Sequence, residues 1–150
     1  MMDVEIRPAN LLDTLGLLGR TQFVGVKGAE ESLRQHMFMS ENSWIGRVDG
    51  VAMVAWGVIA PCVLSSSAYV WVIVADEIKK DPKYRFLFTR YSQRILDILL
   101  EKHESLIGFC YPHQEESIKW IKFLGGEFRE PDEQNRISFK IRRKPDAIRA

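Results

Sequence analysis

Apolar residues recur along this chain at two spacings, one typical of helices and one typical of strands. Within Tyr84–Lys102, apolar residues recur three or four positions apart, which predicts an amphipathic helix. Those positions are Phe88, Tyr91, Ile95, Ile98 and Leu99. The short run Ala68–Val74 is rich in β-branched and aromatic residues and predicts a buried strand. The charged, proline-containing stretch Ala75–Lys83 is expected to form a loop between the two.

Turn and cap signals give the remaining elements. Asp49-Gly50 between two apolar runs predicts a β-hairpin, and Asn10 is a suitable N-cap for a helix. Gly125-Gly126 is suited to end the last helix. The expected strands are Val4–Arg7, Ser43–Val48, Val51–Ile59, Ala68–Val74, Leu106–Tyr111, Glu127–Arg129 and Arg136–Ile141. The expected helices are Leu11–Leu18, Ala29–Met39, Tyr84–Lys102 and Gln114–Leu124.

This order of elements combines an antiparallel meander with crossover helices. It predicts an α/β (α+β) fold in which helices cover both faces of one sheet. Val51–Ile59 is apolar on both faces and is expected near the centre of that sheet. No linker or repeat interrupts residues 1–142, so we expect a single domain followed by a loose tail, residues 143–150.

Composition narrows the class of protein. The chain has 150 residues, of which 46% are hydrophobic and 27% charged, and its net charge is +1. These values are typical of a soluble globular domain and give no strong attraction to nucleic acid or membranes. There is no membrane-length apolar run and no signal peptide, so a cytoplasmic protein is expected; one packaged into a particle after synthesis would look the same. For Cys62 and Cys110, buried reduced thiols are favoured over a disulfide or a nucleophile.

Two local motifs carry a family resemblance. In HQEESIKWIKFLGGEF, Gln114, Ser117, Trp120 and Leu124-Gly125 stand at spacings that resemble a motif of the Gcn5-related N-acetyltransferase (GNAT) superfamily, and VEIRPAN resembles the family's first strand. The resemblance covers nearly the whole chain. It implies a mixed, mostly antiparallel sheet. It also implies an enzyme that transfers acetyl from acetyl-CoA to an amine of a small molecule or protein, as a monomer or homodimer.

A narrower resemblance points to another role. The chain's length, its tryptophan-rich middle and a helix start without glycines resemble the small phage proteins of the T7 internal virion type. That resemblance implies a non-catalytic binding or assembly module, with phage structural proteins as partners and packaging in a virion.

The GNAT resemblance also implies where acetyl-CoA would bind. The pantetheine arm would pair with the main chain of Ile73-Val74-Ala75, and the pyrophosphate would lie on Lys83–Arg90. The cofactor-binding residues are then expected to be Ile73, Val74, Ala75, Arg85, Phe88, Thr89, Arg90 and Gln114.

The phosphate loop departs from the family pattern, which is Gln/Arg-x-x-Gly-x-Gly/Ala. One register places Leu87, Arg90 and Ser92 at its key positions, and the other places Arg85, Phe88 and Arg90 there. Neither register contains a glycine, and Phe88 or Arg90 would add bulk where the cofactor needs room.

Cationic side chains near the start of the predicted helix Tyr84–Lys102 offer a substitute for the missing glycines. They are Lys79, Lys80, Lys83, Arg85, Arg90 and Arg94. Side chains of this kind hold phosphates by charge and bidentate hydrogen bonds. The alternative is a solvated helix face, partly neutralised by Asp76, Glu77 and Asp81. Aromatic interleaving on an exposed surface is not evident, which argues against a nucleic-acid surface.

Acetyl transfer needs a base for the amine and an acid for the leaving thiolate. The family's tyrosine acid falls at Ile121 here, which cannot donate a proton, so Tyr111 is the substitute candidate. His113 is the candidate base because imidazole titrates near neutrality, and Glu77 is a second candidate acting through water. Each has a plain alternative: a packed aromatic residue, a loop histidine and a surface carboxylate. No metal-binding spacing is present, and the four tryptophans fit packing roles, although Trp44 and Trp71 could line a substrate groove.

Overall fold

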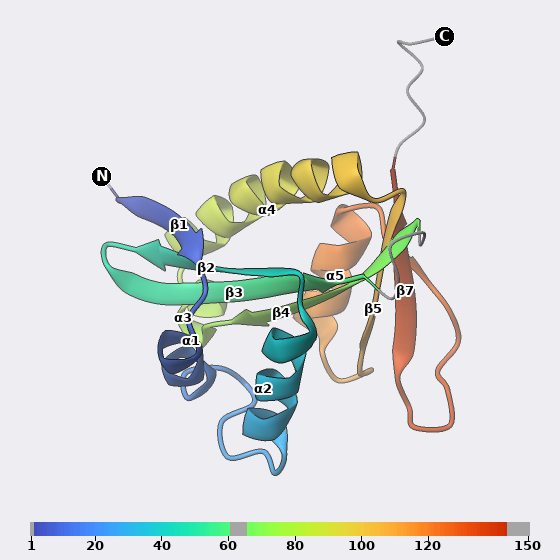
Figure 1. Ribbon diagram of the computed structural model, residues 1–150, viewed down its shortest axis with the longest axis horizontal. Coiled ribbons are helices and arrows are strands. Elements are labelled where there is room, and N and C mark those ends of the chain that lie inside the picture. Colours follow the sequence, from blue (N-terminus) through green and yellow to red (C-terminus); the bar gives the residue numbers. More distant parts are fainter. Residues whose placement is uncertain (1, 61–65, 144–150) are drawn as a thin grey trace, which may run out of the picture. The chain divides into compact units, whose positions relative to one another are not determined.

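The computed structural model describes residues 2–60 and 66–143 of the chain (Figure 1). Its elements are β1 (Val4–Pro8), α1 (Leu11–Leu18), α2 (Ala29–Met39), β2 (Asn42–Val48), β3 (Val51–Ile59), β4 (Ser67–Val74), α3 (Asp76–Lys80), α4 (Pro82–Lys102), β5 (Ser105–Cys110), α5 (Glu115–Phe123), β6 (Glu127–Phe128) and β7 (Ile137–Arg142). The seven strands form one sheet in the order β1-β2-β3-β4-β5-β7-β6. β4 and β5 pair in parallel, and the other pairings given for the described strands are antiparallel. The predicted α/β class with a mostly antiparallel sheet is confirmed.

The chain divides into two compact units. Unit 1 comprises Met1–Ala60 and Val70–Phe88, and unit 2 comprises Pro61–Tyr69 and Thr89–Ala150. The single domain expected over residues 1–142 stays a prediction. Cys62 and nearly all of the predicted tail lie outside the described residues.

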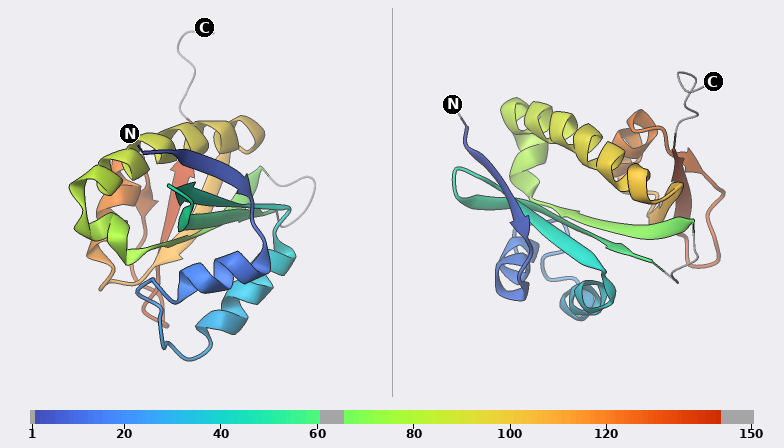
Figure 2. Two further views of the ribbon diagram at one scale, coloured as in Figure 1. Left: turned by 90° about the vertical axis from the view of Figure 1, so that its left-hand side faces the viewer. Right: turned by 45° about the horizontal axis from the view of Figure 1, so that its top comes forward.

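Unit 1 is built on the β2–β3 hairpin. Asp49 and Gly50 form its turn with φ angles of 51° and 81°, the left-handed pair that a two-residue hairpin requires. Helices α1 and α2 lie on one side of these strands, and the first turns of α4 lie on the other (Figure 2). The buried side chains of Leu17, Leu33 and Ile45 belong to this core.

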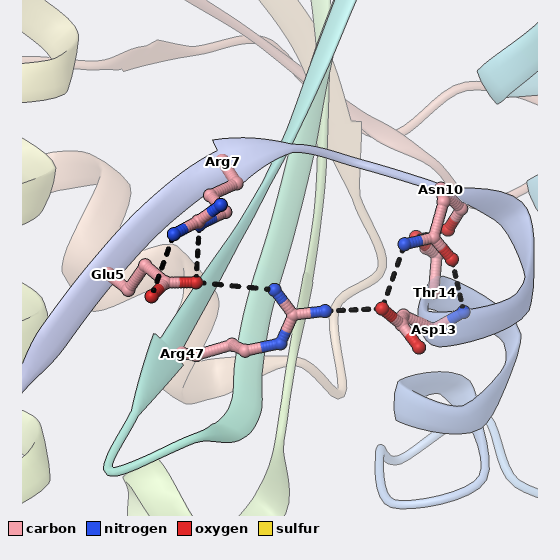
Figure 3. A network of polar contacts seen from close by, with 6 residues as sticks. All are labelled: Glu5, Arg7, Asn10, Asp13, Thr14 and Arg47. Carbon is pink, nitrogen blue, oxygen red and sulfur yellow. Dashed lines mark hydrogen bonds and ion pairs between the residues drawn. The ribbon is translucent and has the colours of Figure 1, made fainter.

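A polar network fixes the start of α1 to strands β1 and β2 (Figure 3). The Asn10 side chain accepts a hydrogen bond from the Asp13 backbone N–H at 2.8 Å, which is an N-cap. Arg47, at a bulge in β2, makes ion pairs with Asp13 and, at 3.8 Å, with Glu5. Glu5 also pairs with Arg7 at 2.6 Å. The charges are therefore satisfied within the network, whose role is to orient α1.

The contact between β3 and β4 is tight because a glycine faces a tryptophan. A Cβ atom built on Gly57 would lie 2.5 Å from Nε1 of the Trp71 ring. The Trp71 ring cannot move away freely, since its Nε1–H donates to the Ser40 hydroxyl at 2.8 Å. Trp71 is thus a buried core residue. The alternative that it lines a substrate groove is wrong.

Unit 2 holds β5, β7, β6, the start of β4 and most of α4. Helix α5 ends in a Schellman motif: the Gly126 N–H donates to the Ile121 carbonyl, the Gly125 N–H donates to that of Lys122, and Gly125 has a φ of 95°. The Trp120 indole N–H donates to the Ser92 hydroxyl at 3.1 Å, which joins α5 to α4.

Two local expectations were wrong. The stretch expected to be a loop, Ala75–Lys83, contains the short helix α3, and α4 already begins at Pro82 because proline suits the first helical position. On α4, Ile98 is 56% exposed, and the buried positions are Leu96, Leu99 and Leu100. The other predicted positions, Phe88, Tyr91, Ile95 and Leu99, are half-buried or buried, so only Ile98 departs from the predicted stripe.

We predict that Gly57→Ala destabilises the protein by about 1–3 kcal/mol, because the new methyl group overlaps the fixed Trp71 ring. Gly16→Ala in α1 is the matched control: no atom lies within 4 Å of its new Cβ, and removing a mid-helix glycine should stabilise by about 0.5–1 kcal/mol. Chemical denaturation measures both changes. Equal stabilities for the two variants would contradict this account of the β3–β4 contact.

Candidate functional site

The end of β4 has one occupied edge. The Ala75 N–H donates to the Met53 carbonyl of β3 at 2.8 Å. Successive residues of a strand direct their backbone groups to alternate edges. Ile73 therefore directs its N–H and C=O groups toward β3, and Val72 and Val74 direct theirs toward the opposite edge. Ala75 gives only its N–H to β3, because its carbonyl accepts a hydrogen bond from the Ile78 N–H of α3 at 3.1 Å.

The parallel ladder between β4 and β5 is short. It comprises the three pairs Ser67–Ser105, Ala68–Leu106 and Tyr69–Ile107. The remaining residues of β4, Val70–Val74, belong to unit 1. Of the predicted main-chain positions Ile73, Val74 and Ala75, only Val74 therefore presents backbone groups on the edge away from β3, and Val72 is added to it.

The start of α4 carries its own cap. Pro82 has no N–H, the Lys83 N–H donates to the Asp81 carboxylate at 2.9 Å, and the Arg85 N–H donates to the Asp81 carbonyl at 3.0 Å. The Asp81 carboxylate also places a negative charge at this helix end, where a phosphate would otherwise be attracted. Backbone capture of a pyrophosphate in the first turn is thus disfavoured.

Cationic side chains still surround this helix start. Lys80, Lys83, Arg85 and Arg90 are exposed and Lys79 is partly exposed, whereas the Arg94 guanidinium lies 5.6 Å from the centre of the Tyr91 ring. Among the described residues, neither Lys83 nor Arg90 has a carboxylate within ion-pair distance. Phe88 and Thr89 are half-buried. Any phosphate here would have to be held by side chains.

Glu77 is engaged by Arg20. The Arg20 Nε lies 3.3 Å from one carboxylate oxygen of Glu77, and a second arginine nitrogen donates to the Ala52 carbonyl at 2.7 Å. The other oxygen, Oε2, is shielded from solvent. The backbone N–H of Glu77 and then the Arg20 guanidinium hold the pKa of the carboxyl below its ordinary value. A carboxylate stabilised in this way is a weak base, which counts against a catalytic role for Glu77.

Tyr111, His113 and Gln114 form a compact turn after β5. The Tyr111 backbone N–H donates to the Gln114 side-chain oxygen at 2.8 Å, and the Gln114 N–H donates to the Tyr111 carbonyl at 2.9 Å. The Tyr111 and His113 rings stack, with centroids 5.9 Å apart and planes 18° apart. Gln114 thus stabilises the turn that carries the two candidate catalytic rings. Ile121, at the family's tyrosine position, is 5% exposed.

The candidate residues fall into two groups. Unit 1 holds Ile73, Val74, Ala75, Glu77, Arg85 and Phe88, and unit 2 holds Thr89, Arg90, Tyr111, His113 and Gln114. The sequence reasoning missed the roles of two residues. The cap formed by Asp81 was detectable, because an aspartate before a proline is a helix-start signal. The engagement of Arg20 with Glu77 spans 57 positions and had no local signal.

A hollow elsewhere on the chain does not involve the predicted site residues. A hollow of about 380 Å³ lies beside the start of α2 and is lined by Val26, Gly28, Glu30, Glu31 and Arg34, none of them a predicted site residue. Within residues 2–60 and 66–143, no group of three or more His, Cys, Asp or Glu side chains is arranged to hold a metal ion. Over the same part of the chain, no helix has the length and apolar character needed to cross a membrane.

Comparison with known proteins identifies the fold. At the level of sequence, no family model and no curated protein matches the chain. Among solved structures, the ribosomal-protein-S18-alanine N-acetyltransferase from Escherichia coli is similar, with a TM-score of 0.68 and 12% identity over 97% of this chain and 98% of that one. The GNAT domain of PAT from S. lividans has a TM-score of 0.70 and 12% identity over 93% and 90% of the two chains. A GNAT-family acetyltransferase from Streptococcus pneumoniae has a TM-score of 0.67 and 9% identity over 92% and 98%.

The chain has the GNAT fold. At these identities the likeness concerns architecture, so activity has to be argued from the residues. None of the three structures is described as a phage protein, and the phage resemblance stays a prediction.

Cys110 provides a test of the thiol assignment. It is buried and free, and burial raises the pKa of its thiol to about 11. We predict that iodoacetamide at about pH 8 labels Cys110 slowly in the folded protein and rapidly in guanidinium, because the reactive thiolate is suppressed by burial. Peptide mapping by mass spectrometry separates it from Cys62. Since the folded-state pKa is raised, the stability that this thiol contributes is complete below pH 9.0 and declines as the pH rises toward 11. Fast labelling of the native protein would restore the nucleophile alternative.

Proposed function

We propose that this protein is an N-acetyltransferase that transfers acetyl from acetyl-CoA to an amine of a small molecule or protein. The observation that carries the proposal is the similarity of at least 92% of the chain to the acetyltransferase structures named above. The mostly antiparallel sheet with one parallel pair, β4 with β5, supports it. We further propose that the protein acts in the cytoplasm as a monomer or homodimer.

The residues present fit the pantetheine arm of acetyl-CoA well and its pyrophosphate less well. The edge of β4 at Val72 and Val74 suits the amide groups of a pantetheine arm, which pair with a strand as another strand would. The capped start of α4 does not suit a pyrophosphate held by backbone, so Lys83, Arg85 and Arg90 would hold it by charge. When bound, acetyl-CoA supplies an activated thioester carbonyl.

The chain's own part in the chemistry is the movement of protons. His113 is the base that accepts a proton from the acceptor's ammonium group, which leaves a neutral amine able to attack. As the C–N bond to the acceptor forms and the thioester C–S bond breaks, the Tyr111 hydroxyl would give a proton to the departing thiolate. Support for this arrangement comes from the stacking of the two rings and from the two hydrogen bonds between the Tyr111 main chain and Gln114.

A second candidate function is a non-catalytic module that keeps this fold for binding or assembly, with phage structural proteins as its partners. Specific observations favour it: the Asp81 carboxylate already caps the start of α4, Pro82 has no N–H to offer there, and the position at which the resemblance implies a tyrosine acid is the buried Ile121. The two candidates differ in whether the protein binds acetyl-CoA at all.

Calorimetry with acetyl-CoA and desulfo-CoA distinguishes them. We predict binding that Arg85→Ala and Arg90→Ala each weaken by about 1–3 kcal/mol, because each removes a charged hydrogen bond to phosphate. Asp81→Asn should tighten binding several-fold, since asparagine keeps the cap and removes the repelling charge. Lys119→Gln, on the exposed surface of α5, is the control and should leave the affinity unchanged.

The result that would reject the enzyme is equally clear. A protein that shows neither heat of binding nor a shift in melting temperature at millimolar acetyl-CoA is not an acetyltransferase, and the assembly module would replace it. Binding that is unaffected by both arginine substitutions would keep the enzyme and remove the side-chain phosphate site.

The base assignment has its own test. We predict that His113→Gln lowers kcat/KM about a hundredfold or more and flattens the acid limb of the pH–rate profile, because the group whose protonation causes that limb is gone. His103→Gln, at the end of α4, should preserve the wild-type profile. An acid limb that persists in His113→Gln would assign the base elsewhere.

A further inference from the structure

One face of the unit 2 sheet differs sharply from the other. Residues directly opposite each other in neighbouring strands share a face. The pairs Ala68–Leu106, Gly108–Phe139 and Cys110–Ile137 belong to the face that is mostly buried. The pairs Tyr69–Ile107, Phe109–Ser138 and Ile107–Lys140 belong to the other face, where these side chains are half-buried or exposed.

Aromatic rings form a continuous row on this second face. Phe109 is its centre: its ring lies 6.4 Å from that of Tyr69 and 5.7 Å from that of Tyr111, and the row continues to His113. The Arg136 guanidinium lies 5.2 Å from the centre of the Phe109 ring. Burial raises the pKa of the Tyr69 hydroxyl, although Arg136 acts in the opposite direction, so this hydroxyl stays a neutral hydrogen-bond donor at neutral pH.

Beside the row of rings, cationic side chains outnumber carboxylates. Arg136 is paired with Asp132 at 3.0 Å, and Arg142 is paired with Glu127 at 3.8 Å. Lys140 lies opposite Ile107 of β5 and opposite Glu127 of β6. The Glu127 carboxylate is the one that pairs with Arg142, and within the described parts of the chain no carboxylate lies within 4.0 Å of the Lys140 ammonium. The half-exposed aromatic surface thus has three cations, Arg136, Lys140 and Arg142, and two carboxylates, Asp132 and Glu127, at its side.

We propose that this face, formed by Tyr69, Phe109, Tyr111, Arg136 and Lys140, binds an acceptor that carries a planar aromatic ring and an anionic group beside its amine. The rings supply flat apolar surface for the acceptor's ring, and Lys140 supplies the complementary charge. The row leads from Tyr69 through Phe109 to Tyr111 and His113, the proposed proton-transfer pair. The inference rests on the proposed acetyl transfer.

A single-stranded nucleic acid is the rival occupant of such a surface, because bases also stack on aromatic side chains. It is disfavoured here, since two of the three cations are already paired with carboxylates and a chain of phosphates needs several free ones.

Three amines test the contributions of the acceptor's ring and of its carboxylate separately. L-phenylalanine has both, phenylethylamine lacks the carboxylate, and L-leucine lacks the ring. With acetyl-CoA as donor, we predict a kcat/KM for L-phenylalanine at least about tenfold above either of the others. Lys140→Gln should reduce the preference for L-phenylalanine over phenylethylamine about fivefold, and Phe109→Leu should reduce its preference over L-leucine. Lys119→Gln should change neither ratio.

Binding measured without acetyl-CoA keeps the two proposals separate. NMR titration of the full chain with L-phenylalanine should shift signals of Phe109 and Tyr111, and Lys140→Gln should weaken that binding, even if acetyl-CoA does not bind. A protein that binds acetyl-CoA and uses the three amines equally would overturn this inference and leave the enzyme. A protein that ignores L-phenylalanine in the titration and binds an oligothymidylate on these residues would overturn it in favour of nucleic acid.

Discussion

The pairing of β4 with β3 is the constraint on which the rest of the structure depends. It is enforced at one end by Trp71, which fills the space left by Gly57 and is held by Ser40, and at the other by the hydrogen bond from Ala75 to Met53. Because strand backbone alternates, this pairing decides which groups of β4 remain for anything else. The backbone groups of Val72 and Val74 face the edge away from β3, whereas those of Ile73 and the N–H of Ala75 face β3.

Much of the fold was predictable because its signals are local. The boundaries of α1, α2 and β3 follow from the Asn10 cap, the helical spacing and the Asp49-Gly50 turn, each of which acts within a few residues. Helix α3 was missed because five residues give no periodicity. Ile98 was misplaced because several apolar stripes fit one helix, and only tertiary packing decides between them.

The candidate site was less predictable, because it depends on register between distant strands. The sequence places Tyr69, Phe109 and Lys140 far apart, and an offset of one residue in either ladder would move them to opposite faces. The rings of Tyr69 and Phe109 lie beside Arg136 only after β4, β5 and β7 are aligned, so no local signal marks this surface. The link between Arg20 and Glu77 was hidden for the same reason.

Asp81 gives α4 a beginning that is complete without any bound anion. In a helix whose first turn waits for a ligand, occupancy and folding are thermodynamically linked, so loss of the ligand weakens the architecture. Here that link is severed at the helix start. The first turn of α4 is therefore equally stable with its surroundings empty or occupied, and the scaffold does not depend on a ligand at this point.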